Sequence, residues 1–94
     1  MATYVLFGKY SAGALKSATE ARTAEAESVI RRNGGELTAA YCLLGDPDLV
    51  LIVEMADTKA ALKVSVALSK TTGIGFRTAP AVGVKEFDAL LGEL

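Results

Sequence analysis

The chain has 94 residues, of which 51% are hydrophobic, and a formal net charge of −1. A chain of this length has room for one core, so we expect a single domain spanning residues 1–94. Acidic and basic residues are interspersed without a basic stripe, so we expect no nucleic-acid partner. No apolar run approaches the roughly 20 residues of a membrane span. We therefore expect a cytoplasmic protein with no membrane partner.

Two features of the composition restrict the chemistry. Cys42 is the only cysteine, which excludes an intrachain disulfide and a cysteine-based metal cage. The chain has no histidine, and therefore lacks the usual general base, the Ser-His and Cys-His dyads and the commonest transition-metal ligand. Asp46 and Asp48 offer oxygen atoms, but an Asp-Pro-Asp stretch is more typical of a turn than of a cation site. We expect no metal and no cofactor.

The first third of the chain predicts a strand followed by a helix. Residues Ala2–Tyr10 alternate between two sides as a strand would. Ser11 is a candidate N-cap, and the stretch Ala12–Arg32, rich in Ala and Glu and free of Pro, predicts one continuous helix. Asn33-Gly34-Gly35 ends it, because Asn and Gly tolerate the left-handed conformation found after helices.

The middle of the chain predicts a hairpin and a second helix. Leu37–Leu44 and Leu49–Met55 are β-branched or leucine-rich runs that flank the tight turn Gly45-Asp46-Pro47-Asp48. Asp57 then caps a helix over Thr58–Lys70.

The last segments complete the pattern of a known architecture. Ile74–Pro80 predicts a final strand, and in the short tail after it Val84, Phe87 and Leu91 share a face. The order strand, helix, strand, strand, helix, strand predicts an α+β fold, the ferredoxin-like βαββαβ sandwich, with two helices on one face of an antiparallel sheet.

The other face of this sheet requires a cover. In the third strand Val50 and Ile52 point away from the helix-facing side, so the strand is apolar on both faces. In the second helix Leu62 and Val66 lie opposite its main apolar stripe. We expect a homo-oligomer, dimer or higher, that forms through the open face. The alternative is that the C-terminal tail folds back over it.

Arg22 is the most unusual charged residue, because it falls within the apolar stripe of the first helix. A guanidinium directed at a sheet needs a partner, for which Glu54, Asp48 or a bound anion would serve. Alternatively, Arg22 extends to the rim or forms a structural ion pair.

Four further polar residues lie in or beside three strands: Lys9, Tyr10, Tyr41 and Arg77. If they converge on one end or face of the sheet, they would hold a carboxylate or phenolate and polarise a carbonyl. The alternative is that they are edge residues that keep the sheet soluble. Cys42, within a strand, is better explained as a small core or interface residue than as a nucleophile.

Residues along nearly the whole chain resemble the GYD domain, a family named for a Gly-x-Tyr-Asp turn between two strands. They are Ala2-Thr3-Tyr4-Val5-Leu6, Gly34-Gly35, Tyr41, Leu44-Gly45-Asp46-Pro47-Asp48-Leu49-Val50, Glu54, Asp57 and Arg77-Thr78. The resemblance implies a fold of the dimeric α/β barrel group. Pro47 stands where the naming motif has Tyr, whereas Gly45 and Asp48 match it.

The same turn also resembles the ligand-binding domain of the Lrp/AsnC regulators. The shared residues are Gly45 and Asp48, followed by Gly73-Ile74 and Arg77-Thr78. That resemblance implies amino-acid binding at contacts between subunits near the turn. No DNA-binding helix-turn-helix precedes the turn, so we expect a stand-alone version.

Three classes of function follow. The first is a small-molecule binding or sensing module whose pocket lies at or near subunit contacts. The second is a cofactorless enzyme of the dimeric α/β barrel kind, with Lys9, Tyr10, Arg22 or Glu54 as acid or base. The third is a structural assembly unit. The candidate ligand-binding residues are Lys9, Tyr10, Arg22, Tyr41, Gly45, Asp48, Glu54 and Arg77. A ligand at the Gly45 turn would favour sensing, and a cavity between the sheet and the first helix would favour catalysis.

Overall fold

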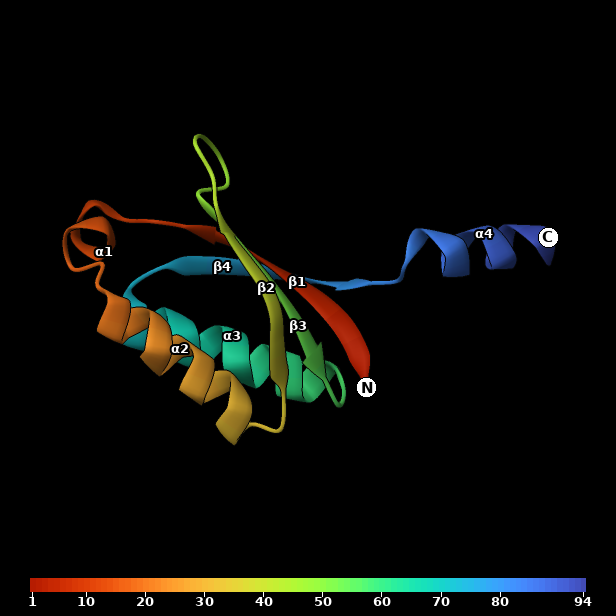
Figure 1. Ribbon diagram of the computed structural model, residues 1–94, viewed down its shortest axis with the longest axis horizontal. Coiled ribbons are helices and arrows are strands. Elements are labelled where there is room, and N and C mark those ends of the chain that lie inside the picture. Colours follow the sequence, from red (N-terminus) through yellow and green to blue (C-terminus); the bar gives the residue numbers. More distant parts are fainter.

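Four antiparallel strands form one sheet in the order β2-β3-β1-β4, and two long helices cover one of its faces (Figure 1). The computed structural model describes residues 1–94. Its elements are β1 (Ala2–Lys9), α1 (Ala12–Lys16), α2 (Glu20–Arg32), β2 (Glu36–Cys42), β3 (Leu49–Met55), α3 (Thr58–Thr72), β4 (Gly75–Ala81) and α4 (Val84–Gly92). The ferredoxin-like α+β fold predicted from the sequence is confirmed. None of the helices has both the length and the apolar character of a membrane span.

The core lies between the sheet and the helices α2 and α3. Alternate residues of β1 and β3 project toward the helices, and the fully enclosed side chains are Leu6, Ile30, Val53, Met55, Val64 and Leu68. Burying a side chain of this size stabilises the fold by about 1.5–3 kcal/mol. The same alternation leaves the other residues of each strand on the open face.

The first helical region differs from its prediction, because the helix expected over Ala12–Arg32 is two helices. Thr19 is extended, and its side chain accepts a hydrogen bond from the Arg22 N–H as the N-cap of α2. Ser17 ends α1, and its hydroxyl donates to the Gly13 carbonyl at 2.9 Å. Hydroxyl side chains that bond the nearby backbone favour helix ends over helix interiors. This local competition outweighed the helix propensity of the surrounding alanines.

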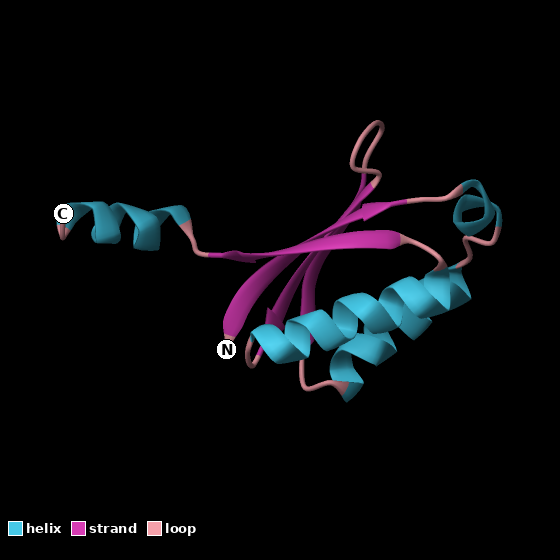
Figure 2. Cartoon of the chain, turned by 180° about the vertical axis from the view of Figure 1, so that it is seen from behind, coloured by secondary structure: helices cyan, strands magenta, loops and turns pink.

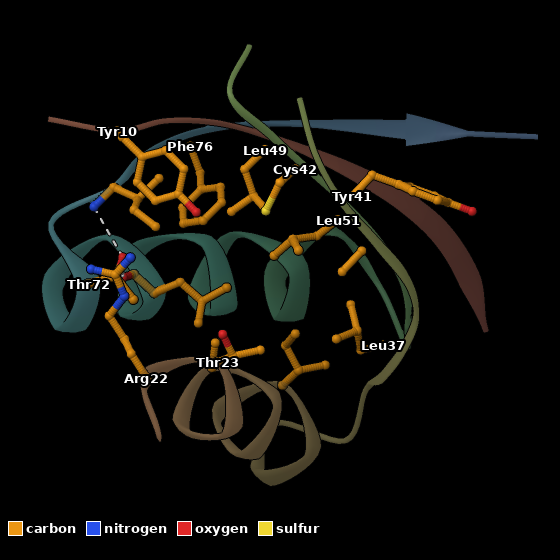
Figure 3. A pocket seen from close by; sticks show the side chains of 15 residues that line it. Tyr10, Arg22, Thr23, Leu37, Tyr41, Cys42, Leu49, Leu51, Thr72 and Phe76 are labelled. Atoms are coloured by element: carbon orange, nitrogen blue, oxygen red, sulfur yellow. Dashed lines mark hydrogen bonds between the residues drawn. The ribbon is translucent and has the colours of Figure 1, made fainter. Parts of the chain in front are cut away.

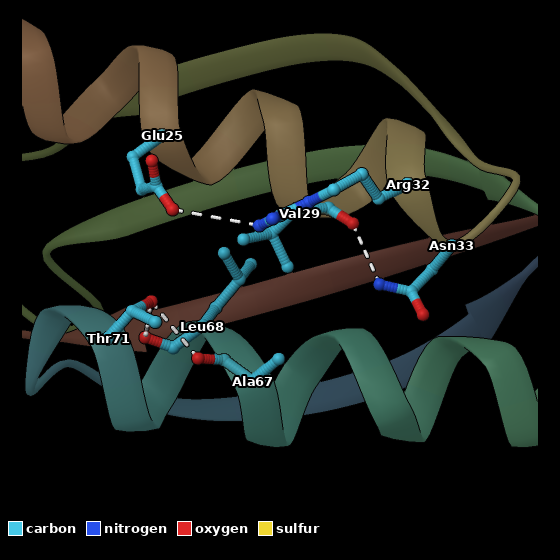
Figure 4. A network of polar contacts seen from close by, with 7 residues as sticks. All are labelled: Glu25, Val29, Arg32, Asn33, Ala67, Leu68 and Thr71. Atoms are coloured by element: carbon cyan, nitrogen blue, oxygen red, sulfur yellow. Dashed lines mark hydrogen bonds and ion pairs between the residues drawn. The ribbon is translucent and has the colours of Figure 1, made fainter.

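Polar side chains near the C-terminal ends of both long helices donate to backbone carbonyls of the same helix (Figure 4). Asn33 Nδ2 donates to the Val29 carbonyl at 2.8 Å, and Thr71 Oγ1 donates to the Ala67 carbonyl at 3.0 Å. Helix α3 continues two residues beyond the expected Lys70, and Gly73 after it has the left-handed φ of 75°.

The C-terminal helix α4 lies apart from the rest of the domain. In Figures 1 and 2 it continues outward from the end of β4, and no residue in it is buried. The alternative in which the tail folds back over the open face is therefore wrong for this structure. The open face stays uncovered by the chain itself.

Candidate ligand pocket

A cavity of about 140 Å³ lies between the helix-facing side of the sheet and the helices α2 and α3 (Figure 3). It is lined mainly by apolar side chains: Tyr10, Arg22, Thr23, Ala26, Ile30, Leu37, Ala40, Tyr41, Cys42, Leu49, Leu51, Leu68, Thr72, Ile74 and Phe76. An engineered cavity of about 150 Å³ lined by Leu, Ile and Phe is large enough to bind benzene. The pocket therefore has room for one ring or a short branched chain.

The Arg22 guanidinium is the only positive charge in this lining. Its Nη1 donates to the Ala14 carbonyl, in the middle of α1, and to Ser17 Oγ at 3.3 Å. These bonds depend on the break between α1 and α2, which leaves the carbonyls of α1 without partners in a continuing helix. No carboxylate forms an ion pair with Arg22: the ion pairs of this chain involve Lys9, Arg31 and Arg32. The guanidinium therefore keeps donors available for an anion.

Tyr10 lies beside Arg22 at the same end of the pocket. The Arg22 Cζ is 5.8 Å from the centroid of the Tyr10 ring, a cation–π distance. Burial and the neighbouring Cys42 raise the pKa of the Tyr10 hydroxyl above 10.0, and Arg22 opposes that rise. The hydroxyl therefore keeps its proton at neutral pH and is a hydrogen-bond donor rather than a base.

Thr72 also lines the pocket, but its hydroxyl is already engaged. It donates to the Leu68 carbonyl at 2.6 Å and accepts from the Ile74 N–H at 3.1 Å, the bond drawn in Figure 3. The groups that remain available to polar atoms of a ligand are those of Arg22, Tyr10 and, at the exposed rim, Cys42 and Thr23.

A β-bulge in β2 decides which side chains of that strand face the pocket. Leu37 pairs with Val53 and Ala39 with Ile52, so the register shifts between them. Beyond this shift Cys42, not Tyr41, is on the helix-facing side, and Figure 3 shows the Tyr41 ring directed out of the pocket. Cys42 therefore lines the pocket, contrary to the expectation of a plain core or interface residue. A strict two-residue alternation in the sequence gives no signal for this exchange.

Asp48 connects the hairpin loop to the pocket. Its carboxylate Oδ2 accepts from the Tyr10 backbone N–H at 2.9 Å, and its own N–H donates to the Gly8 carbonyl at 2.9 Å. The loop is wider than the four-residue turn expected, because β2 ends at Cys42 and the Leu43 N–H donates to the Asp48 carbonyl. Gly45 in this loop has a φ of +133°, which favours glycine. Asp48 therefore fixes the backbone just after the end of β1 and so positions Tyr10.

A second, polar hollow of about 290 Å³ lies on the other side of the loop, where Lys9 and Arg77 meet Asp46 and Pro47. The Lys9 Nζ is 3.7 Å from Asp46 Oδ1, and the Arg77 guanidinium lies over the Phe7 ring with its Cζ 5.6 Å from the centroid. Both cations are exposed and both already have a neighbour within the chain. This hollow offers a weaker and more hydrated anion site than the Arg22 pocket.

The open face of the sheet is arranged in rows that cross all four strands. One row contains Tyr41, Val50, Phe7 and Arg77, and the next contains Ala39, Ile52, Val5 and Ala79. In the third row, Glu54 accepts hydrogen bonds from Thr3 Oγ1 at 2.8 and 2.9 Å. Glu54 is thus on the open face and does not contact Arg22.

The structure separates the candidate residues into three groups. Tyr10 and Arg22 meet in the pocket. Lys9, Gly45, Asp48 and Arg77 lie at or beside the loop hollow, and Glu54 and the Tyr41 side chain belong to the open face. Lys9, Tyr10, Tyr41 and Arg77 therefore do not form one cluster, because Tyr10 lies beyond the end of β1 and on the opposite side of the sheet.

An antiparallel sheet in the order β2-β3-β1-β4, with two helices over one face and a pocket between them and the sheet, defines a ferredoxin-like α+β domain. The chain belongs to the GYD domain family, whose model matches residues 4–91. The membership predicted from residues along the chain is thereby confirmed.

The fold is also similar to a solved structure, the leucine response regulatory protein (LrpA) of Mycobacterium tuberculosis. The identity is 12% and the TM-score 0.58, over 87% of this chain and 51% of that chain. The chain thus spans about half the length of that protein, and at this identity the similarity shows a shared fold. The weaker similarity to Lrp/AsnC regulators is confirmed at that level. No curated protein matches the chain.

Proposed function

We propose that this domain binds a small organic acid in the pocket between the sheet and the helices α2 and α3. The apolar part of this acid would be one ring or a short branched chain. The observation that carries the proposal is the Arg22 guanidinium, which borders an apolar cavity and has no carboxylate partner. A carboxylate or phenolate would accept charge-assisted hydrogen bonds from Arg22 and a further bond from the protonated Tyr10 hydroxyl. The apolar lining would bury the rest of the molecule.

The composition of the lining favours simple acids over amino acids. The solved structure with a similar fold is named a leucine response regulatory protein. Leucine has a body of suitable size, but its ammonium group needs an acidic partner when buried, and no Asp or Glu lines this pocket. We therefore expect 4-methylpentanoate, which is leucine without the ammonium group, to bind more tightly than leucine.

Catalysis by a cofactorless enzyme is the second candidate. It is supported by the location of the cavity, between the sheet and the first long helix. Against it, the pKa of Tyr10 is raised, and neither Lys9 nor Glu54 lines the pocket. The residues that line the pocket therefore favour binding without turnover over catalysis. Mass spectrometry of the acid after prolonged incubation with the protein separates the two candidates. An unchanged acid supports binding, and a new product supports catalysis.

Calorimetric titration with benzoate and with neutral benzamide tests the binding proposal. We expect benzoate to bind and benzamide to bind much more weakly. Arg22→Met should weaken benzoate about tenfold to a hundredfold, because a hydrogen bond to a charged group contributes about 1.5–3 kcal/mol. Arg31→Met is the matched control, since Arg31 is an exposed arginine of the same helix whose partner is Glu27. Equal affinities of wild type and Arg22→Met for benzoate would contradict the proposal.

We also infer that the open face pairs with a second copy of the chain. Its two central rows are apolar apart from Tyr41 and Arg77 at the ends of one row, and the chain itself does not cover them. Ile52→Lys, in the middle of this face, should shift the sedimentation mass toward that of the 9.8 kDa monomer. Ala24→Lys, on the exposed side of α2, should leave the mass unchanged. A wild type that is monomeric at micromolar concentration would refute the inference.

A further inference from the structure

Helix α4 has an apolar stripe with no partner in the chain. Val84, Phe87, Leu90 and Leu91 are each at least 50% exposed, and the helix stands apart from the domain in both views (Figures 1 and 2). At 100° per residue these four side chains share one face, as in amphipathic helices that pack against another element. A stripe of this kind at the end of a short domain marks an interaction surface.

The charges beside this stripe are acidic. Asp88 flanks it on one side and Glu86 and Glu93 flank it on the other, whereas the single basic residue, Lys85, lies on the far side of the helix. None of these acidic side chains forms an ion pair within the chain. The surface that fits α4 is therefore an apolar ridge bordered by unpaired basic residues.

The outer face of α3 has that chemistry. Leu62 and Val66, four residues apart, are exposed there, and Lys59, Lys63 and Lys70 form a column beside them. The helix contains no acidic residue, and none of its lysines forms an ion pair in the chain. Because α3 is the only helix with an exposed apolar pair beside three lysines, it complements α4 in both charge and hydrophobicity.

We propose that α4 docks on the outer face of α3 in a second copy of this chain. Its apolar stripe would pack against Leu62 and Val66, and its acidic residues would face the lysine column. A second copy is favoured over the same chain by the short connection. β4 stays paired with β1 up to Ala81, and only Val82 and the extended Gly83 separate it from α4. Contact with its own α3 would require the chain to reverse direction within those two residues.

This contact is separate from the open sheet face and does not depend on what occupies the pocket. It joins two different surfaces, α4 of one copy and α3 of the other, so each chain supplies one of each. Ile52→Lys therefore tests the open face alone, because Ile52 belongs to neither helix, and charge changes on α3 and α4 test this contact alone. A monomeric wild type would refute both.

Charge reversal in two variants tests the contact. Lys59→Glu/Lys63→Glu makes the α3 face acidic, and Asp88→Lys/Glu93→Lys makes the α4 flanks basic. All four side chains are exposed, and the new charges lie where the helix dipole tolerates them, so we expect both variants to fold, as circular dichroism would verify. Each variant alone should self-associate about tenfold more weakly than wild type in sedimentation velocity, because like charges then face each other.

Mixing the two variants in equal amounts is the decisive experiment. The acidic α3 of one variant then meets the basic α4 of the other, so mixing should restore association, with mixed species visible in native mass spectrometry. If mixing does not restore association but both reversals combined in one chain do, then α4 docks on its own chain and the proposal is wrong. Association that neither variant weakens would overturn it as well.

Discussion

Asp48 provides a sharp test of how the hairpin loop supports the pocket. In Asp48→Ala the Tyr10 backbone N–H loses its acceptor, the carboxylate oxygen 2.9 Å away. A hydrogen bond to a charged group contributes about 1.5–3 kcal/mol, and partial exposure of this one brings the expected loss to about 1–2 kcal/mol. For a domain of this size such a loss lowers Tm by about 4–16 °C. Since Tyr10 becomes less well positioned, binding of benzoate should weaken too.

The assay is chemical denaturation followed by circular dichroism, with two matched variants. Asp48→Asn retains a side-chain oxygen and should recover most of the loss. Asp46→Ala changes the neighbouring acid of the same loop, whose 3.7 Å contact with Lys9 is between exposed side chains, and should cost less than about 0.5 kcal/mol. Equal losses of stability in Asp46→Ala and Asp48→Ala would show that the hydrogen bond from the Tyr10 N–H to Asp48 contributes nothing beyond the charge of the loop.

Three further predictions concern single residues. The pKa of Tyr10 is raised, so the free energy of unfolding of wild type should fall relative to Tyr10→Phe as pH rises above 10, which denaturation at a series of pH values measures; parallel stability profiles would contradict this. Gly35→Ala should cost about 1–3 kcal/mol in denaturant, because the added Cβ overlaps Met55 Sδ, and a neutral result would show that Met55 moves aside easily. Thr19→Ala removes the N-cap of α2 and should cost about 1 kcal/mol in the same assay, where an unchanged midpoint would show that the cap adds nothing.

The sequence predicted the elements whose signals are local and strong. The continuous apolar run from Leu49 predicted the strand Leu49–Met55 with its observed bounds, and Asp57 predicted the start of α3. An apolar run beside a turn and an N-cap are both signals carried by neighbouring residues. The prediction of one helix over Ala12–Arg32 is wrong because that stretch contains Ser17 and Thr19, whose hydroxyls bond the backbone at a break.

The site was only partly accessible from the sequence. Arg22 stood out, because a charge within an apolar stripe is visible in a helical pattern. Cys42 was missed, since the bulge in β2 that turns it toward the pocket depends on pairing with β3 rather than on the residues of β2 alone. The link from Asp48 to Tyr10 joins residues 38 positions apart, and only the folded sheet brings them together.

Amide chemical-shift mapping during a titration with benzoate shows whether a small acid binds at Arg22, between the sheet and the helices. We expect the largest shifts on the backbone N–H groups of Tyr10, Arg22, Cys42 and Thr72, which surround the pocket. Shifts concentrated instead on Lys9, Asp46 and Arg77, around the loop hollow, or no saturable shifts at all, would contradict it.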